Sequence, residues 1–148
     1  MRHLLALAGL AVLTTGCYHK PTKMDVEAQG TAWAEALSSR NPETITGLYD
    51  DDAVLLATFI TKAEGEDAIR EYFEGLTKNE GLSVRFDDQI IEVVGRKAAI
   101  NTGTYTFSYK DKDGKTVEVP ARYTFVYEKE GKEWEIISHH SSIRPESK

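Results

Sequence analysis

The sequence lacks a second cysteine: Cys17 stands alone, so no disulfide can form within the chain. Basic residues are also in deficit, because 18 Lys and Arg are outnumbered by 24 Asp and Glu, giving a formal net charge of -6. A nucleic-acid partner is not expected, since binding to phosphates requires clustered positive charge. The G-x-S-x-G, P-loop, dinucleotide-binding and zinc-ligand spacings are absent too. No motif therefore assigns a reaction, and we expect no cofactor and no metal.

A hydrophobic run long enough for a permanent transmembrane helix is missing as well. The apolar stretch at residues 4–13 is much shorter than the ~20 residues that span a bilayer. It follows Arg2 and His3, and a short positive start before an apolar segment is typical of a secretory signal. We therefore interpret residues 1–16 as a signal peptide.

The lone cysteine lies directly after this segment. The stretch Leu13-Thr14-Thr15-Gly16-Cys17 resembles a bacterial lipobox, whose cysteine is lipidated on sulfur and becomes the new N-terminus, although Thr14 stands where a leucine-like residue is preferred. We expect a lipid anchor at Cys17, a tether over residues 17–23, and a location in the bacterial cell envelope on the periplasmic or outer-membrane face. An ordinary secretory signal with an incidental cysteine is the alternative.

One compact domain is expected over residues 24–146, and its first part is helical. Apolar residues recur at helical spacing from Val26 through Trp33 to Leu37, which predicts a long amphipathic helix. Asn41-Pro42-Glu43 then carries the signals of a second helix start.

We expect this second helix to bury Leu48 and Tyr49 and to end at a solvated turn, Asp50-Asp51-Asp52. A third helix opens at Gly65-Glu66-Asp67 and ends before Gly81.

The rest of the domain is strand and turn. A strand is predicted at 53–56, followed after the third helix by four runs with strand-like composition, at 82–94, 98–109, 117–127 and 134–142. Helices and strands are segregated along the chain, which indicates an α+β fold with a curved antiparallel sheet. Gly103 is expected to leave room for a long side chain or a ligand, because it has no Cβ.

The last two strands bring a cation close to two imidazoles. Folding the chain about residues 129–132 places Arg122 opposite Ser138, His139 or His140, depending on whether the loop is plain or bulged. Which imidazole shares the face of Arg122 is left open, because one residue of slip inverts every side chain.

The elements and several motifs together resemble the nuclear transport factor 2-like superfamily. The likeness covers about residues 24–146 and is most specific at Arg122 to Tyr127 and at His139-His140-Ser141-Ser142. Within it, the chain is similar to SnoaL-like proteins and to bacterial relatives of the association domain of calcium/calmodulin-dependent protein kinase II. The resemblance implies a cone-shaped fold with N-terminal helices over the concave face of the sheet, a deep pocket, and a homodimer formed through the sheet.

The same resemblance separates this chain from two well-known members. Thr104 and Ser141 stand where the kinase association domain has arginines, which weakens any transfer of its ligand preference. Ketosteroid isomerase has its general-base aspartate near the position of Ala57 here, so proton abstraction of that type is not expected.

We therefore predict a lipid-anchored, exported pocket protein that binds a small polar or anionic molecule without turnover. One alternative is a small dehydratase, isomerase or hydrolase that uses His139 or His140 as general acid or base; another is a dimeric assembly module. A dimer is also expected because alternating aromatics on two strands are expected to give the sheet two apolar faces. The residues expected to line the pocket are Arg122, His140, His139, Trp33, Tyr49, Thr104 and Ser142.

The lipid anchor can be tested by a single substitution. The change Cys17→Ser removes the sulfur that would carry the lipid, so the protein should move from the membrane fraction to the soluble fraction. Cell fractionation with immunoblotting measures the partition. An unchanged membrane fraction, together with processing by an ordinary signal peptidase, would contradict the anchor.

Overall fold

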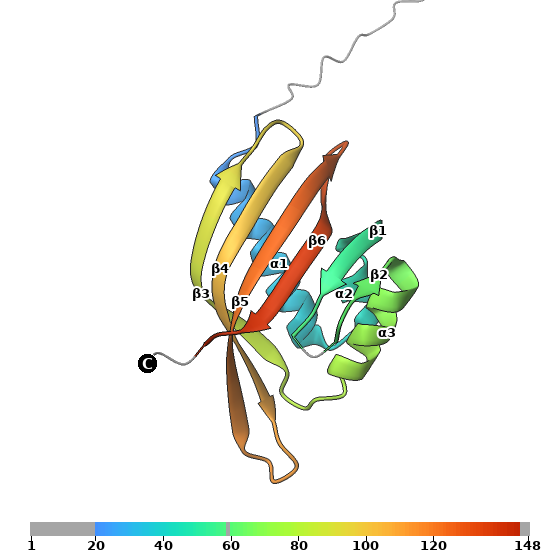
Figure 1. Cartoon of the computed structure of the whole chain (residues 1–148), viewed down its shortest axis with the longest axis vertical. Helices are drawn as coiled ribbons and strands as arrows, with labels where there is room; N and C mark the ends of the chain where they lie inside the picture. The colour runs from blue at the N-terminus through green and yellow to red at the C-terminus, as the bar shows by residue number, and fades with distance from the viewer. Residues whose placement is uncertain (1–19, 59, 146–148) are drawn as a thin grey trace, which may run out of the picture.

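The computed structural model describes residues 20–58 and 60–145 as three helices and six strands (Figure 1). The expected signal peptide, and Cys17 with most of the expected tether, lie outside the described residues. No helix within the described ranges is long and apolar enough to cross a membrane. The elements are α1 (Lys23–Ser39), α2 (Pro42–Thr46), β1 (Tyr49–Leu56), β2 (Ala63–Glu64), α3 (Glu66–Leu76), β3 (Ser83–Val93), β4 (Ala98–Lys110), β5 (Thr116–Glu130) and β6 (Glu133–Ile143).

The six strands form one curved sheet with the order β2-β1-β6-β5-β4-β3 (Figure 1). Neighbouring strands are antiparallel, as expected, except that β1 runs parallel to β6. A parallel pair needs a long connection rather than a hairpin, and here nearly the whole domain separates the two strands. The fold is therefore α+β, as the sequence predicted.

Helix α1 begins and lies as the sequence predicted. Thr22 Oγ1 accepts from the backbone N–H of Asp25 at 3.3 Å, and the Asp25 carboxylate accepts from the Thr22 N–H at 2.7 Å, which forms a capping box. The buried stripe of the helix runs from Val26 through Trp33 to Leu37. In Figure 1, α1 lies behind the sheet, and we call the sheet face that it covers the inner face.

The predicted end of the second helix is wrong. Asn41 caps α2 by accepting from two backbone N–H groups, as expected, but the helix ends at Thr46. Tyr49 and the three aspartates belong to strand β1, which pairs with β6 at Tyr49 and again from Val54, with an irregularity between them. A tertiary pairing therefore overrides the helical spacing and the charge of Asp50-Asp51-Asp52.

The inner face carries the core. Strand residues alternate between faces, so Tyr105 of β4 and Tyr123, Phe125 and Tyr127 of β5 all point inward and are buried. They pack against Trp33, whose ring centroid lies 5.1 Å from that of Phe125. The expectation that these aromatics give the sheet a second apolar face is therefore wrong, because they share one face.

Gly103 is required by the backbone of the neighbouring strand rather than by a ligand. Strand β3 carries a bulge between Phe86 and Asp88 that pushes its backbone toward β4. A Cβ at residue 103 would lie 2.1 Å from the carbonyl oxygen of Asp88, a distance that no real side chain tolerates. The free space expected beside Gly103 is thus occupied by the β3 bulge.

The register expected for the last hairpin is also wrong. Strands β5 and β6 pair up to Glu130 and Glu133, and an irregularity lies between Val126 and Tyr127, so Arg122 lies opposite Ser142. The tight turn and the extra residue each move the partner of Arg122 further along β6 than the sequence estimate allowed.

Candidate functional site

The structure divides the predicted site residues between two faces of the sheet. Thr104, Arg122 and Ser142 are register neighbours on adjacent strands, and His140 lies on the same face of β6. This face is opposite to the one covered by α1, and we call it the outer face. Trp33, Tyr49 and His139 lie in the buried interior.

Arg122 therefore does not line the interior. Its side chain is exposed, and its Nη2 donates to Ser142 Oγ at 3.4 Å. Water solvates a guanidinium in this position, so neither a buried acid nor a ligand is needed to compensate its charge. The expectation that this arginine and a histidine meet inside the fold is wrong.

The interior instead contains a chain of uncharged hydrogen-bonded side chains centred on His139. Trp33 Nε1 donates to Tyr49 OH at 3.0 Å, and Tyr49 OH lies 2.9 Å from His139 Nδ1. His139 is 3% exposed, and its ring packs against Phe125 with the centroids 4.2 Å apart. The histidine is thus fixed both by packing and by hydrogen bonds.

The chain continues from the other ring nitrogen toward the surface. His139 Nε2 lies 3.4 Å from Tyr105 OH, which donates to Ser141 Oγ at 2.6 Å. Ser141 Oγ lies 2.8 Å from Thr58 Oγ1. We call the whole series, Trp33, Tyr49, His139, Tyr105, Ser141 and Thr58, the polar chain.

One consistent set of donors runs along the polar chain. An indole N–H can only donate, so Tyr49 OH accepts from Trp33 and can pass its own hydrogen to His139 Nδ1. In this set His139 carries its hydrogen on Nε2, which donates to Tyr105 OH. Tyr105 donates to Ser141, whose hydroxyl can pass its hydrogen to Thr58. In that arrangement the Thr58 hydroxyl has a hydrogen to donate elsewhere.

Burial keeps this histidine neutral. Desolvation, with a smaller contribution from the neighbouring charge of His140, lowers the pKa of His139 from 6.5 to about 3. Burial likewise raises the pKa of Tyr49 and of Tyr105, so both phenols stay protonated at physiological pH. No group of the polar chain is charged near neutral pH.

The polar chain ends at a small cavity between α3 and the β4–β5 hairpin. This cavity has a volume of about 20 Å³, enough for about one water molecule. We call it the mouth cavity, and it is lined by Thr58, Tyr72, Leu76, Leu82, Phe107, Tyr109 and Val119. Its wall is apolar apart from the hydroxyls of Thr58 and the tyrosines.

The sequence interpretation missed four residues of this site. Tyr105 and Ser141 could have been found from strand alternation, since Ser141 shares the face of His139. Thr58 follows β1 without a distinguishing pattern, and Tyr72 lies inside the predicted third helix, where its spacing does not distinguish it from a core residue.

Comparisons with known proteins agree with the fold. The chain matches the family model of the calcium/calmodulin dependent protein kinase II association domain over residues 22–145. A candidate association domain of this kind from Xanthomonas campestris has 33% sequence identity and a TM-score of 0.81, with 99% of this chain and 100% of that chain covered. No curated protein shows significant similarity to the sequence.

More distant structures share the fold alone. A nuclear transport factor 2 (NTF2-like) superfamily protein from Salmonella enterica has 19% identity and a TM-score of 0.75, covering 85% of this chain and 93% of that chain. A candidate dehydratase of the NTF2-like family from Streptomyces avermitilis has 19% identity and a TM-score of 0.74, covering 83% and 96%. The resemblance expected from the sequence is confirmed.

The neutral state of His139 predicts a pH dependence of stability. Between its folded pKa of about 3 and its unfolded value of 6.5, the unfolded chain binds the extra proton, so stability is lost as the pH falls through this window. The free energy of unfolding should fall by about 1 kcal/mol between pH 7.5 and pH 5.5. Urea unfolding at the two pH values measures it.

Two variants assign this effect to the right histidine. His139→Gln cannot titrate and should remove most of the difference between the two pH values. His140→Gln changes the exposed neighbour and should keep it. If the free energy of unfolding falls equally in wild type and His139→Gln between the two pH values, His139 is not the cause.

Proposed function

The chain belongs to the calcium/calmodulin-dependent protein kinase II association-domain family, and we propose that it is a non-enzymatic binding protein for a small polar molecule. The observation that carries this proposal is the polar chain, whose last hydroxyl, that of Thr58, lines the mouth cavity. Thr58 lines that cavity and can donate to an oxygen of a ligand. The ligand's polar group is therefore an uncharged hydrogen-bond acceptor.

The polar chain supports binding better than turnover. A general acid or base works best with a pKa near the operating pH, whereas the pKa of His139 is lowered to about 3. Both nitrogens of this ring are also engaged by tyrosine hydroxyls. His140, the other candidate, lies on the exposed outer face. Neither histidine has the properties of a catalytic group.

The interior supports a neutral ligand rather than an anion. The side chains that line the mouth cavity are aliphatic, aromatic or hydroxylic, and none is cationic. A buried anion without a paired charge would carry a large desolvation cost. The cationic Arg122, expected from the sequence to hold an anion, lies outside.

Export and a lipid anchor belong to the same proposal. The apolar segment before Cys17 and the lipobox-like sequence support them. An anchored binding protein would hold its ligand at the cell envelope, on the periplasmic or outer-membrane face.

A matched pair of small probes tests the binding proposal. We expect 2-butanone, a neutral acceptor, to bind saturably with its carbonyl oxygen at the mouth cavity and its alkyl part outside that cavity, and butanoate, its charged counterpart, not to bind. Thr58→Val keeps the shape but removes the donor, so it should weaken 2-butanone binding roughly two- to tenfold. Titrations followed by protein NMR chemical shifts measure both affinities.

Arg122→Ala is the control for this experiment, because its side chain lies on the outer face. It should leave 2-butanone binding unchanged. Butanoate binding that disappears in Arg122→Ala would overturn the proposal in favour of an anion site on the outer face.

A second candidate function, homodimeric assembly, is favoured by the outer face. No helix within the described residues covers this face, which is turned toward the viewer in Figure 1. It exposes the apolar side chains of Ile90, at 56%, and Leu56, at 41%. A second copy packed on this face would remove both from water.

Light scattering on residues 20–148 should then give twice the monomer mass. Ile90→Lys places a charge on the outer face and should lower the mass to that of a monomer. Met24→Lys is the matched control, because Met24 is equally apolar, 76% exposed and located on α1. Wild-type protein that is monomeric at micromolar concentration would contradict the dimer.

A further inference from the structure

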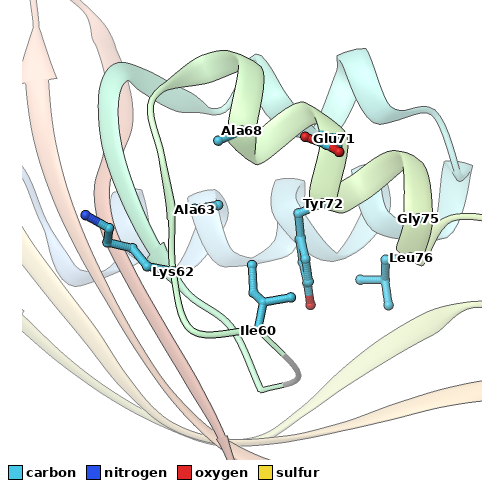
Figure 2. Close-up of a pocket in the computed structure, with 8 residues that line it drawn as sticks. All are labelled: Ile60, Lys62, Ala63, Ala68, Glu71, Tyr72, Gly75 and Leu76. Carbon is cyan, nitrogen blue, oxygen red and sulfur yellow. The ribbon is translucent and has the colours of Figure 1, made fainter.

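A larger depression lies beside α3, next to the mouth cavity. Its volume is about 530 Å³, within the range of about 300–1,000 Å³ that is typical of small-molecule sites. We call it the α3 groove; it is lined by Ile60, Lys62, Ala63, Ala68, Glu71, Tyr72, Gly75 and Leu76 (Figure 2). Tyr72 and Leu76 also line the mouth cavity, so the two spaces adjoin.

Gly75 has no structural reason to be a glycine. A glycine inside a helix costs about 0.5–1 kcal/mol relative to alanine. Its φ is not positive, and a Cβ built on it would meet nothing within 4 Å among the described residues. Neither the backbone nor the packing of α3 thus requires it. What the missing side chain provides is open space in the wall of the α3 groove.

Tyr72 supplies a hydrogen-bonding group between the groove and the mouth cavity. Figure 2 shows its ring extending from α3 on the same side as Ile60 and Leu76. Burial raises the pKa of Tyr72 to about 12, so the hydroxyl keeps its hydrogen. This hydroxyl makes no hydrogen bond to any described residue, and it is not among the fully buried polar atoms that lack a partner, so it is accessible and can donate to a ligand.

The charges at the groove do not favour an anion. Lys62, the cation of its lining, forms an ion pair with Glu64. Glu71 is the remaining charged side chain of the lining and makes no ion pair within the described part of the chain. The rest of the lining is aliphatic, aromatic or glycine.

We propose that the α3 groove holds the apolar body of a neutral ligand whose single acceptor oxygen accepts from Tyr72 and Thr58 at the mouth cavity. The ligand class is therefore an uncharged amphiphile, such as a long-chain ketone, and not a fatty acid. This inference rests on the proposed binding function and adds to it the place and chemistry of the ligand's apolar part.

A series of ketones from 2-butanone to 2-nonanone distinguishes the contribution of the ligand's apolar body to the affinity from that of its oxygen. Each added methylene that enters the groove should raise the affinity for wild-type protein about fourfold. Gly75→Leu fills the open space with a side chain that helices favour. It should abolish this increase per methylene, and it should weaken 2-butanone, which has the shortest alkyl part, less than the longer ketones. Gly75→Ala, the matched control, improves the helix with one methyl group and should keep most of the increase.

The oxygen contact has its own signature. Tyr72→Phe should weaken every ketone of the series by the same factor, two- to tenfold, without changing the increase per methylene. Circular dichroism melting of each variant shows whether it is folded, and NMR titration of the full-length protein measures the affinities.

Three outcomes would overturn the inference. An unchanged methylene increase in folded Gly75→Leu would place the apolar body elsewhere, and the binding proposal would stand if Thr58→Val still weakened 2-butanone. Nonanoate that binds more tightly than 2-nonanone would show that the ligand class is wrong. If no ketone binds, both the inference and the proposed function fail.

Discussion

His139 lies in the middle of the interior, with its two ring nitrogens engaged by the hydroxyls of Tyr49 and Tyr105. At 3% exposure a charged imidazole would lose nearly all of its hydration, so the ring must stay neutral. Trp33 can only donate to the polar chain at its inner end, and the Thr58 hydroxyl lies at its outer end. An uncharged polar chain thus connects the mouth cavity to a residue deep in the fold.

Because strand residues alternate between the two faces of the sheet, residues that are adjacent in the sequence lie in different environments. His139 and His140 are adjacent, yet one is buried and the other exposed. Arg122 and Tyr123 differ in the same way. The inner face uses aromatic rings and hydroxyls, whereas the outer face carries the charged groups and the exposed aliphatic side chains. The proposed ligand binding and the proposed assembly therefore involve different residues.

The sequence predicted the elements of the fold well, because helical spacing and caps such as Asn41-Pro42 act locally. It did not predict which face Arg122 occupies. That depends on a tight turn at Gly131 and on one extra residue in β6, and each shift of one residue inverts a strand.

Other features of the site could not be predicted for a different reason. Thr58 meets Ser141 only because β1 lies beside β6, a pairing with no local sequence signal. The predicted helical conformation of Tyr49 was wrong for the same reason, because Tyr49 also pairs with β6. The contribution of Gly75 is visible only when the space around its Cα is known.

The parallel pairing of β1 with β6 joins the beginning of the domain to its end. Contacts between such distant parts of a chain form slowly, because the loop between them must be closed before they contribute any stability. Tyr49 and Thr58 are made early in synthesis, but their partners His139 and Ser141 are among the last residues of the domain. A nascent chain therefore has no polar chain and no mouth cavity until its last strand is in place. For a chain exported unfolded, as we propose for this one, this order of events would keep the proposed binding site from forming before export.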